Sequence, residues 1–74
     1  MPLDNLGQHL QRIYDSEINV SISWFWDSGI DVSLGDKYNA TVAETNLKNA
    51  KDILPWLQTQ IQQHLPESEY AKSL

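Results

Sequence analysis

The chain of 74 residues contains no cysteine, so neither disulfide bonds nor thiolate–metal links can hold it together. A chain of this length fits one small domain, residues 1–74, and buries only about 60% of the surface that its unfolded form exposes. Its stability must come from an apolar core, supplemented by any self-association. We therefore expect a single domain to which each large core side chain contributes a sizeable share of stability.

Positive charge is also scarce, because five Lys and Arg stand against ten Asp and Glu, for a net charge of −5. Neither Lys nor Arg occurs between Ile13 and Lys37. Proteins bind nucleic acids through clustered cations that replace the counterions of the phosphates. Anionic membranes attract the same kind of cluster. We expect neither a nucleic acid nor a membrane as a partner.

Long hydrophobic runs are absent, and none approaches the roughly 18 apolar residues of a membrane-spanning helix. The first residues, MPLDNLGQHL, lack the basic and then apolar pattern of a signal peptide. These two observations predict a cytoplasmic protein.

What the chain does contain is a stretch of alternating apolar and polar residues from Ile18 to Glu44. Two turn signals, Asp27–Gly29 and Gly35–Lys37, divide it into three segments rich in β-branched and aromatic residues. This pattern predicts three antiparallel strands joined by two hairpins, with Gly29 in the left-handed conformation of the first loop.

The parity of the two loops predicts which residues face each other. If each loop has three residues, one face of the sheet is apolar throughout. The predicted pairs are Trp26–Ile30, Trp24–Val32 and Ile22–Leu34 in the first hairpin, and Leu34–Tyr38, Val32–Ala40 and Ile30–Val42 in the second.

Apolar residues recur with helical spacing on both sides of this stretch, over about 4–14 and about 50–64. Pro55 either kinks the second helix or marks its true start. Residues 67–74 are predicted to form a flexible tail, although Tyr70 within it could fold back onto the domain. The expected fold is an α+β two-layer sandwich in which two helices cover one face of a three-stranded meander (α-β-β-β-α).

The run from Ser23 to Asp36, SWFWDSGIDVSLGD, resembles a stretch found in a small group of bacterial proteins with an S-x-F-W-D-G-G-x-D-V-x-L-G-D-like pattern. Ser28 stands where that pattern has the first of two glycines. The resemblance implies a cytosolic bacterial protein, and it implies no activity, cofactor or partner.

Three aspartates, Asp27, Asp31 and Asp36, suggest a hard-cation site by composition. However, Asp27 and Asp36 lie at opposite ends of the second predicted strand, about 16 Å apart. Turn chemistry explains them better. The sequence also lacks a cysteine nucleophile and a glycine-rich phosphate loop. We therefore expect no metal site, no cofactor and no catalytic residues.

The aromatic residues support two alternative interpretations. They could line a small-ligand pocket between the helices and the open end of the sheet, made of Trp24, Trp26, Tyr38, Trp56 and His64. Because the pattern places Trp24 and Trp26 on the covered face, core packing is the favoured interpretation for these two.

The opposite face of the sheet is predicted to be bare and weakly polar. Its members are Ser21, Ser23, Phe25, Asp31, Ser33 and Thr41. Such a face suits either solvent or a second copy of the chain, and the outer strands could also pair with another edge. We therefore predict a non-catalytic protein-interaction module that acts as a homodimer, with a small-ligand-binding domain as the alternative.

Overall fold

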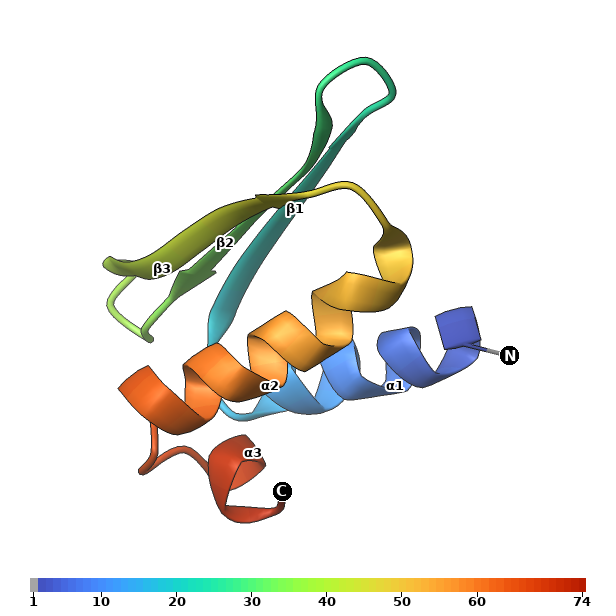
Figure 1. Cartoon of the computed structure of the whole chain (residues 1–74). Coiled ribbons are helices and arrows are strands. Elements are labelled where there is room, and N and C mark those ends of the chain that lie inside the picture. The colour runs from blue at the N-terminus through green and yellow to red at the C-terminus, as the bar shows by residue number, and fades with distance from the viewer. Residues whose placement is uncertain (1) are drawn as a thin grey trace.

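A computed structural model of the chain describes the backbone of residues 2–74 and the side chains of residues 6–74. The elements follow one another as α1 (Pro2–Asp15), β1 (Asn19–Phe25), β2 (Gly29–Gly35), β3 (Thr41–Leu47), a 3₁₀ turn (Ala50–Asp52), α2 (Ile53–His64) and α3 (Glu69–Lys72). The strands form one antiparallel sheet in the order β1-β2-β3. The predicted α+β fold is confirmed, with α3 as an additional short helix (Figure 1).

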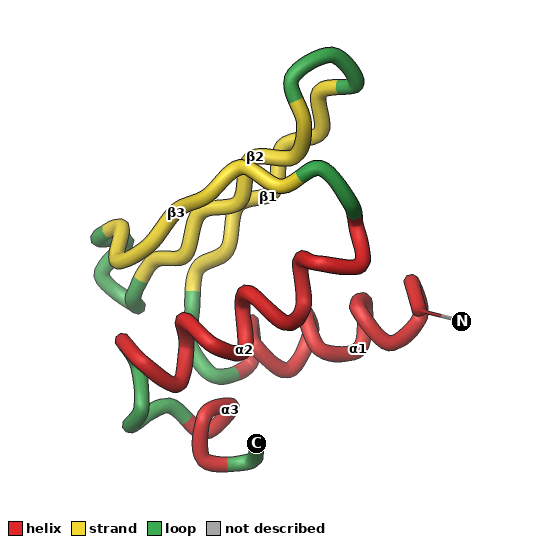
Figure 2. Tube along the Cα trace, viewed as in Figure 1, coloured by secondary structure: helices red, strands yellow, loops and turns green. Residues whose placement is uncertain are grey.

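The two longer helices, α1 and α2, lie on the same side of the sheet (Figures 1 and 2). In α2, Ile53, Leu57 and Ile61 recur at every fourth position, so they share one face of the helix, and all three are buried. The core contains side chains from α1, the sheet, α2 and α3: Ile13, Ile18, Ile30, Val32, Leu34, Ile53, Leu57, Ile61 and Tyr70. The helices and the central strand β2 therefore enclose most of this core.

The first hairpin keeps the predicted faces but has a different register. Ile22 lies opposite Val32 and Trp24 opposite Ile30, because the loop comprises residues 26–28 rather than 27–29. A shift of two residues leaves every side chain on its predicted face, since side chains alternate with a period of two. Gly29 has a φ of +98°, the left-handed conformation predicted for it.

The second hairpin differs from the prediction in both loop and register. The loop covers residues 36–40, so Tyr38 and Ala40 precede β3 instead of belonging to it. The observed pairs are Leu34–Ala43, Val32–Thr45 and Ile30–Leu47, with a register shift between Leu34 and Gly35. The predicted pairing of Tyr38, Ala40 and Val42 with β2 is therefore wrong.

Asp36 explains why this loop is longer than three residues. Its Oδ1 accepts hydrogen bonds from the backbone N–H of Tyr38 at 2.9 Å and of Ala40 at 3.1 Å. Asn39, which tolerates the left-handed region better than most residues, has a φ of +67°. The side chain of Asp36 thus organises a five-residue turn, as its predicted role in turn chemistry implies.

Replacing Asp36 with alanine is expected to lower the free energy of unfolding by about 1–2 kcal/mol, because two backbone N–H groups lose their acceptor. Asp27→Ala is the matched control at the other hairpin, since Asp27 is exposed and accepts no hydrogen bond within the described part of the chain. Urea unfolding of both variants at one protein concentration measures the difference. Equal losses at the two positions would contradict the role assigned to Asp36.

Pro55 lies inside the first turn of α2, which begins at Ile53. Backbone N–H groups in the first turn have no partner within the helix, so proline costs little there. Asn49 starts the preceding 3₁₀ turn, and its side chain accepts a hydrogen bond from the N–H of Lys51 at 3.0 Å. Of the two predicted roles, Pro55 therefore belongs to the start of the main helix.

The prediction of a flexible tail over residues 67–74 is wrong for most of that segment. α3 forms there, and Ser68 caps it by accepting a hydrogen bond from the N–H of Ala71 at 3.2 Å. Tyr70 is buried, with only 2% of its surface exposed. The end of the chain therefore belongs to the packed domain, because one large aromatic side chain anchors it.

Candidate functional site

The five residues predicted to line one pocket are not brought together. Tyr38 and His64 line a hollow of about 680 Å³ beside the loop between α1 and β1. Trp24 and Trp26 line a separate hollow of about 630 Å³ at the first hairpin. Trp56 lines neither of these two hollows and packs, partly buried, against the core. The predicted pocket is therefore wrong, since its members lie in three different places.

The residues predicted for the bare face do share one face of the sheet. Register places Ser21 opposite Ser33, Ser23 opposite Asp31 and Thr41 opposite Gly35. They alternate along the strands with Val20, Ile22 and other side chains that pack against the core. The face away from the helices thus carries the predicted set: Ser21, Ser23, Phe25, Asp31, Ser33 and Thr41.

This outer face is more polar than predicted, because β3 contributes Asn46 to it. The Nδ2 of Asn46 donates hydrogen bonds to Oδ1 of Asp31 at 2.7 Å and to the carbonyl of Ser28 at 3.0 Å. Lys48 donates to the same carbonyl at 3.2 Å and to Oδ1 of Asn46 at 3.0 Å. Polar groups that already satisfy one another gain little from a partner, so this part of the face suits water.

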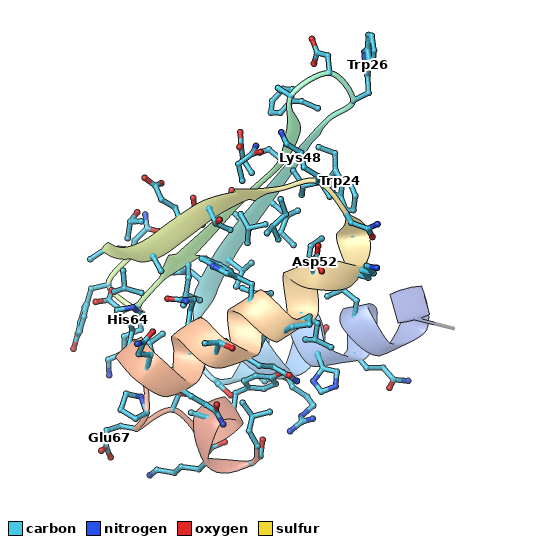
Figure 3. The ribbon with its side chains drawn as sticks, in the orientation of Figure 1. Trp24, Trp26, Lys48, Asp52, His64 and Glu67 are labelled. Carbon is cyan, nitrogen blue, oxygen red and sulfur yellow. The ribbon has the colours of Figure 1, made fainter. Side chains whose placement is uncertain are left out.

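Three successive exposed aromatic residues form what we call the aromatic tip: Trp24, Phe25 and Trp26, with exposed fractions of 57%, 51% and 98%. The first hairpin extends past the helices, and Trp26 stands at its end (Figures 1 and 3). The predicted core packing of Trp24 and Trp26 is therefore wrong. Trp24 is on the predicted face of β1, but it lines an open hollow with Asn49 and Ala50 instead of entering the core.

The outer edge of β1, away from β2, is free and runs the length of the strand, Asn19–Phe25. Natural edge strands are usually protected by charges, proline or bulges, which prevent pairing with another chain. β1 contains no charged residue and no proline, and its register with β2 is regular. β3, at the other edge, carries Glu44 and contributes to the register shift. Only one of the two edges is thus unprotected.

A groove of about 320 Å³ runs beside the inner side of this free edge. We call it the α1–β1 groove, and its lining residues are Leu10, Ile13, Tyr14, Ile18, Asn19, Val20 and Ile22. None of these side chains is charged, and Tyr14 is 75% exposed. Its volume is at the lower end of the range of about 300–1,000 Å³ found for ligand pockets.

Among residues 6–74, the carboxylates and histidines show no arrangement typical of metal binding. Asp36 and Asp31 accept the hydrogen bonds described above, and His9 Nδ1 lies 2.8 Å from the hydroxyl of Tyr70. Within residues 6–74, no three His, Asp or Glu side chains form a group that could hold a metal ion. No helix within residues 2–74 has the length and apolar character required to cross a membrane.

Comparison of the chain with protein-family models, curated proteins and solved structures finds no significant match. The geometry of the aromatic tip, the free edge and the α1–β1 groove is therefore the basis for a functional proposal. Sequence reasoning missed Leu10 and Tyr14 as site residues. The sequence signal for them is the position of Tyr14 at the end of the apolar stripe of α1. An aromatic ring at that position extends past the edge of the core.

Proposed function

We propose that this chain is a non-catalytic protein-interaction module of the cytoplasm that acts as a homodimer through the free edge of β1. The observation that carries the proposal is an uncharged, proline-free edge strand that ends in three exposed aromatic residues. An unprotected edge offers a row of unpaired N–H and C=O groups for strand addition. Tryptophan is also the residue type most enriched where protein interfaces concentrate their binding energy.

The small size of the domain adds a physical motive for self-association. The described core rests on a few large side chains, and many chains of this length gain stability by forming oligomers. A net charge of −5 opposes the approach of two copies, but the free edge itself is uncharged. A contact confined to β1 and the aromatic tip contains no charged side chain, and the nearest charges along the chain are Glu17 and Asp27 at its two ends.

Sedimentation velocity and light scattering from low to high micromolar concentrations test the proposal. We expect a reversible dimer for the native chain and a monomer for Trp24→Lys at the same concentrations. Lysine at this position places on the edge the kind of charge that protects natural edge strands, and it removes one aromatic side chain. Trp24 is 57% exposed and lies outside the core, so the substitution should leave the fold intact.

Thr41→Lys is the matched control, because it adds the same charge to the outer face at the other side of the sheet. We expect it to dimerise as the native chain does. If Thr41→Lys abolished the dimer and Trp24→Lys did not, the outer face rather than the β1 edge would be the interface. A native chain that stays monomeric at high micromolar concentration would overturn the proposed function.

A further inference from the structure

We infer a specific arrangement of the two copies, which rests on the proposed function. The two β1 strands pair antiparallel about Ile22, and Trp24 and Trp26 of each copy cover the α1–β1 groove of the other. The groove is thus a binding site whose ligand is a second copy of this chain. The argument combines the symmetry of the pair, the orientation of the backbone of β1 and the positions of the tip and the groove.

Symmetry restricts the pairing first. Two identical antiparallel edge strands are related by a two-fold axis perpendicular to the sheet, and such a pair uses the same surface on both copies. Residues directly opposite each other then lie on the same face, so the helices of both copies cover one side of a six-stranded sheet. The axis lies midway between one residue of β1 and the same residue of the partner, because only then does each inner side chain face an inner side chain.

The middle of the strand is Ile22, and an axis there pairs all seven residues from Asn19 to Phe25. Trp24 then lies opposite the partner's Val20, and Ser21 opposite the partner's Ser23. An axis at Ser21 or Ser23 leaves two residues of β1 without a partner. The longest ladder of backbone hydrogen bonds therefore selects Ile22.

The backbone of β1 is oriented for this pairing. The carbonyl of Phe25 accepts a hydrogen bond from the N–H of Ser28 at 3.1 Å, so it points into the first hairpin. Backbone groups of successive residues point to alternate sides of a strand. Val20, Ile22 and Trp24 therefore direct their N–H and C=O groups to the free edge. These are the residues that would exchange hydrogen bonds across the two-fold axis.

The aromatic tip and the α1–β1 groove lie at opposite ends of β1, so a two-fold axis at its middle brings them together. Trp26 extends beyond the helices of its own copy (Figure 3), and Trp24 and Trp26 then lie beside the partner's Val20 and the partner's Ile18. Val20 and Ile18 both line the groove, together with apolar side chains of α1. Each copy thus supplies the cover that the other copy's hairpin lacks.

Complete coverage of both tryptophans in both copies would bury enough area for a stable dimer. With exposed fractions of 57% and 98%, Trp24 and Trp26 leave on the order of 350 Å² per copy uncovered. Both copies contribute, and each covered area buries a similar area of the opposite copy. The total is then on the order of 1,400 Å², within the range of about 1,200–2,000 Å² of stable interfaces.

Single cysteine variants test the register, because the native chain has no cysteine. Ser21 and Ser23 of opposite copies form a non-hydrogen-bonded pair, whose Cα atoms lie about 4.5 Å apart. A disulfide bond can span this distance. We expect an equimolar mixture of Ser21→Cys and Ser23→Cys to form a disulfide-linked heterodimer under mild oxidation. Neither variant alone, nor Ser33→Cys on the central strand, should cross-link to a comparable extent.

The other outcomes each overturn the inference. Cross-linking of Ser21→Cys alone places the axis at Ser21, and cross-linking of Ser23→Cys alone places it at Ser23. A dimer that Trp24→Lys dissociates but that forms no cross-link uses the edge of β1 in another register, so the proposed function then survives while this arrangement fails. A monomer overturns both.

Trp26→Ala provides a second measurement that does not depend on cysteine. Trp26 is 98% exposed, so its removal leaves the packing of the monomer unchanged. If it lies in the partner's groove, the dimer dissociation constant should rise at least about tenfold, as for central aromatic residues of other interfaces. A dissociation constant unchanged within about twofold would overturn the docking of the tip.

Discussion

Replacing Tyr70 with alanine is expected to lower the free energy of unfolding by about 3–5 kcal/mol, the range found when large aromatic side chains are removed from cores. The total stability of a 74-residue chain is on the order of 4–11 kcal/mol, so this loss would unfold a substantial fraction of the molecules. Urea unfolding followed by circular dichroism measures the loss. All variants should be compared at one protein concentration, because dimer formation makes apparent stability depend on it.

The physical reason is that Tyr70 links three helices. Its ring lies edge-on to that of His9, with centroids 5.8 Å apart, and the guanidinium of Arg12 lies 5.2 Å from its centroid. Its hydroxyl lies 2.8 Å from Nδ1 of His9 and accepts a hydrogen bond from Nε2 of Gln58 at 3.3 Å. His9 and Arg12 belong to α1 and Gln58 to α2, so the ring holds α3 against both.

Tyr70→Phe separates packing from hydrogen bonding. It keeps the ring and its contacts but removes the hydroxyl, and the expected loss is about 1 kcal/mol. The sequence of stabilities should therefore be native, then Tyr70→Phe, then Tyr70→Ala, with the larger step at the end. A loss below about 1 kcal/mol for Tyr70→Ala would show that residues 67–74 do not contribute to the packed domain.

The burial of Tyr70 could not be predicted from the sequence. Residues 67–74 are mostly polar and follow Pro66, a combination that predicts a frayed end. One buried aromatic side chain overrides that composition, because its contacts come from His9 and Gln58, which lie far from it along the chain. No pattern within the tail itself contains this information.

The alternating pattern of Ile18–Leu34 predicts the correct faces of β1 and β2, although the observed register differs by two residues. Parity depends only on whether a loop has an odd or even number of residues. The prediction failed at the second hairpin, where the side chain of Asp36 bonds to two backbone N–H groups of a five-residue loop and a register shift after Leu34 exchanges the faces of β3. Such a bond lengthens the loop without leaving a periodic signal.

The candidate site could be predicted only in part. The alternation placed Trp24 on the inner face, and the structure agrees. The alternation could not show that the hairpin extends past the helices. Whether a helix covers a given part of a strand depends on how the two layers pack in three dimensions, which a periodic pattern along the chain does not contain. Three successive aromatic residues indicate that at least one of them is exposed. Neighbours in a strand point to opposite faces, so they cannot all enter one core.

The second large effect is expected at Gly29, where alanine should lower the free energy of unfolding by about 2–4 kcal/mol. Its φ of +98° is costly for any residue with a Cβ atom. A Cβ atom there would also lie 2.8 Å from the carbonyl oxygen of Leu47 and 2.9 Å from Oδ1 of Asn46. The Leu47 oxygen is part of the backbone, so β3 or the hairpin must move to accommodate the methyl group.

Gly7→Ala is the matched control, because it makes the same chemical change where neither obstacle exists. Gly7 lies inside α1, and a Cβ atom there would meet nothing within 4 Å. Alanine at an exposed position inside a helix should raise the free energy of unfolding by about 1 kcal/mol. The two variants are therefore expected to change stability in opposite directions. Losses of similar size at both positions would contradict a specific role for the conformation of Gly29.

Gly29 also connects the fold to the proposed dimer, because it is paired with Phe25 at the base of the aromatic tip. A methyl group that displaces the hairpin from β3 must change the direction in which Trp24 and Trp26 leave the sheet. Molecules of Gly29→Ala that remain folded should therefore dimerise more weakly than the native chain, whereas Gly7→Ala should dimerise equally well. Sedimentation velocity below the urea transition measures both. A folded Gly29→Ala protein with native dimer affinity would show that the interface does not depend on the geometry of the tip.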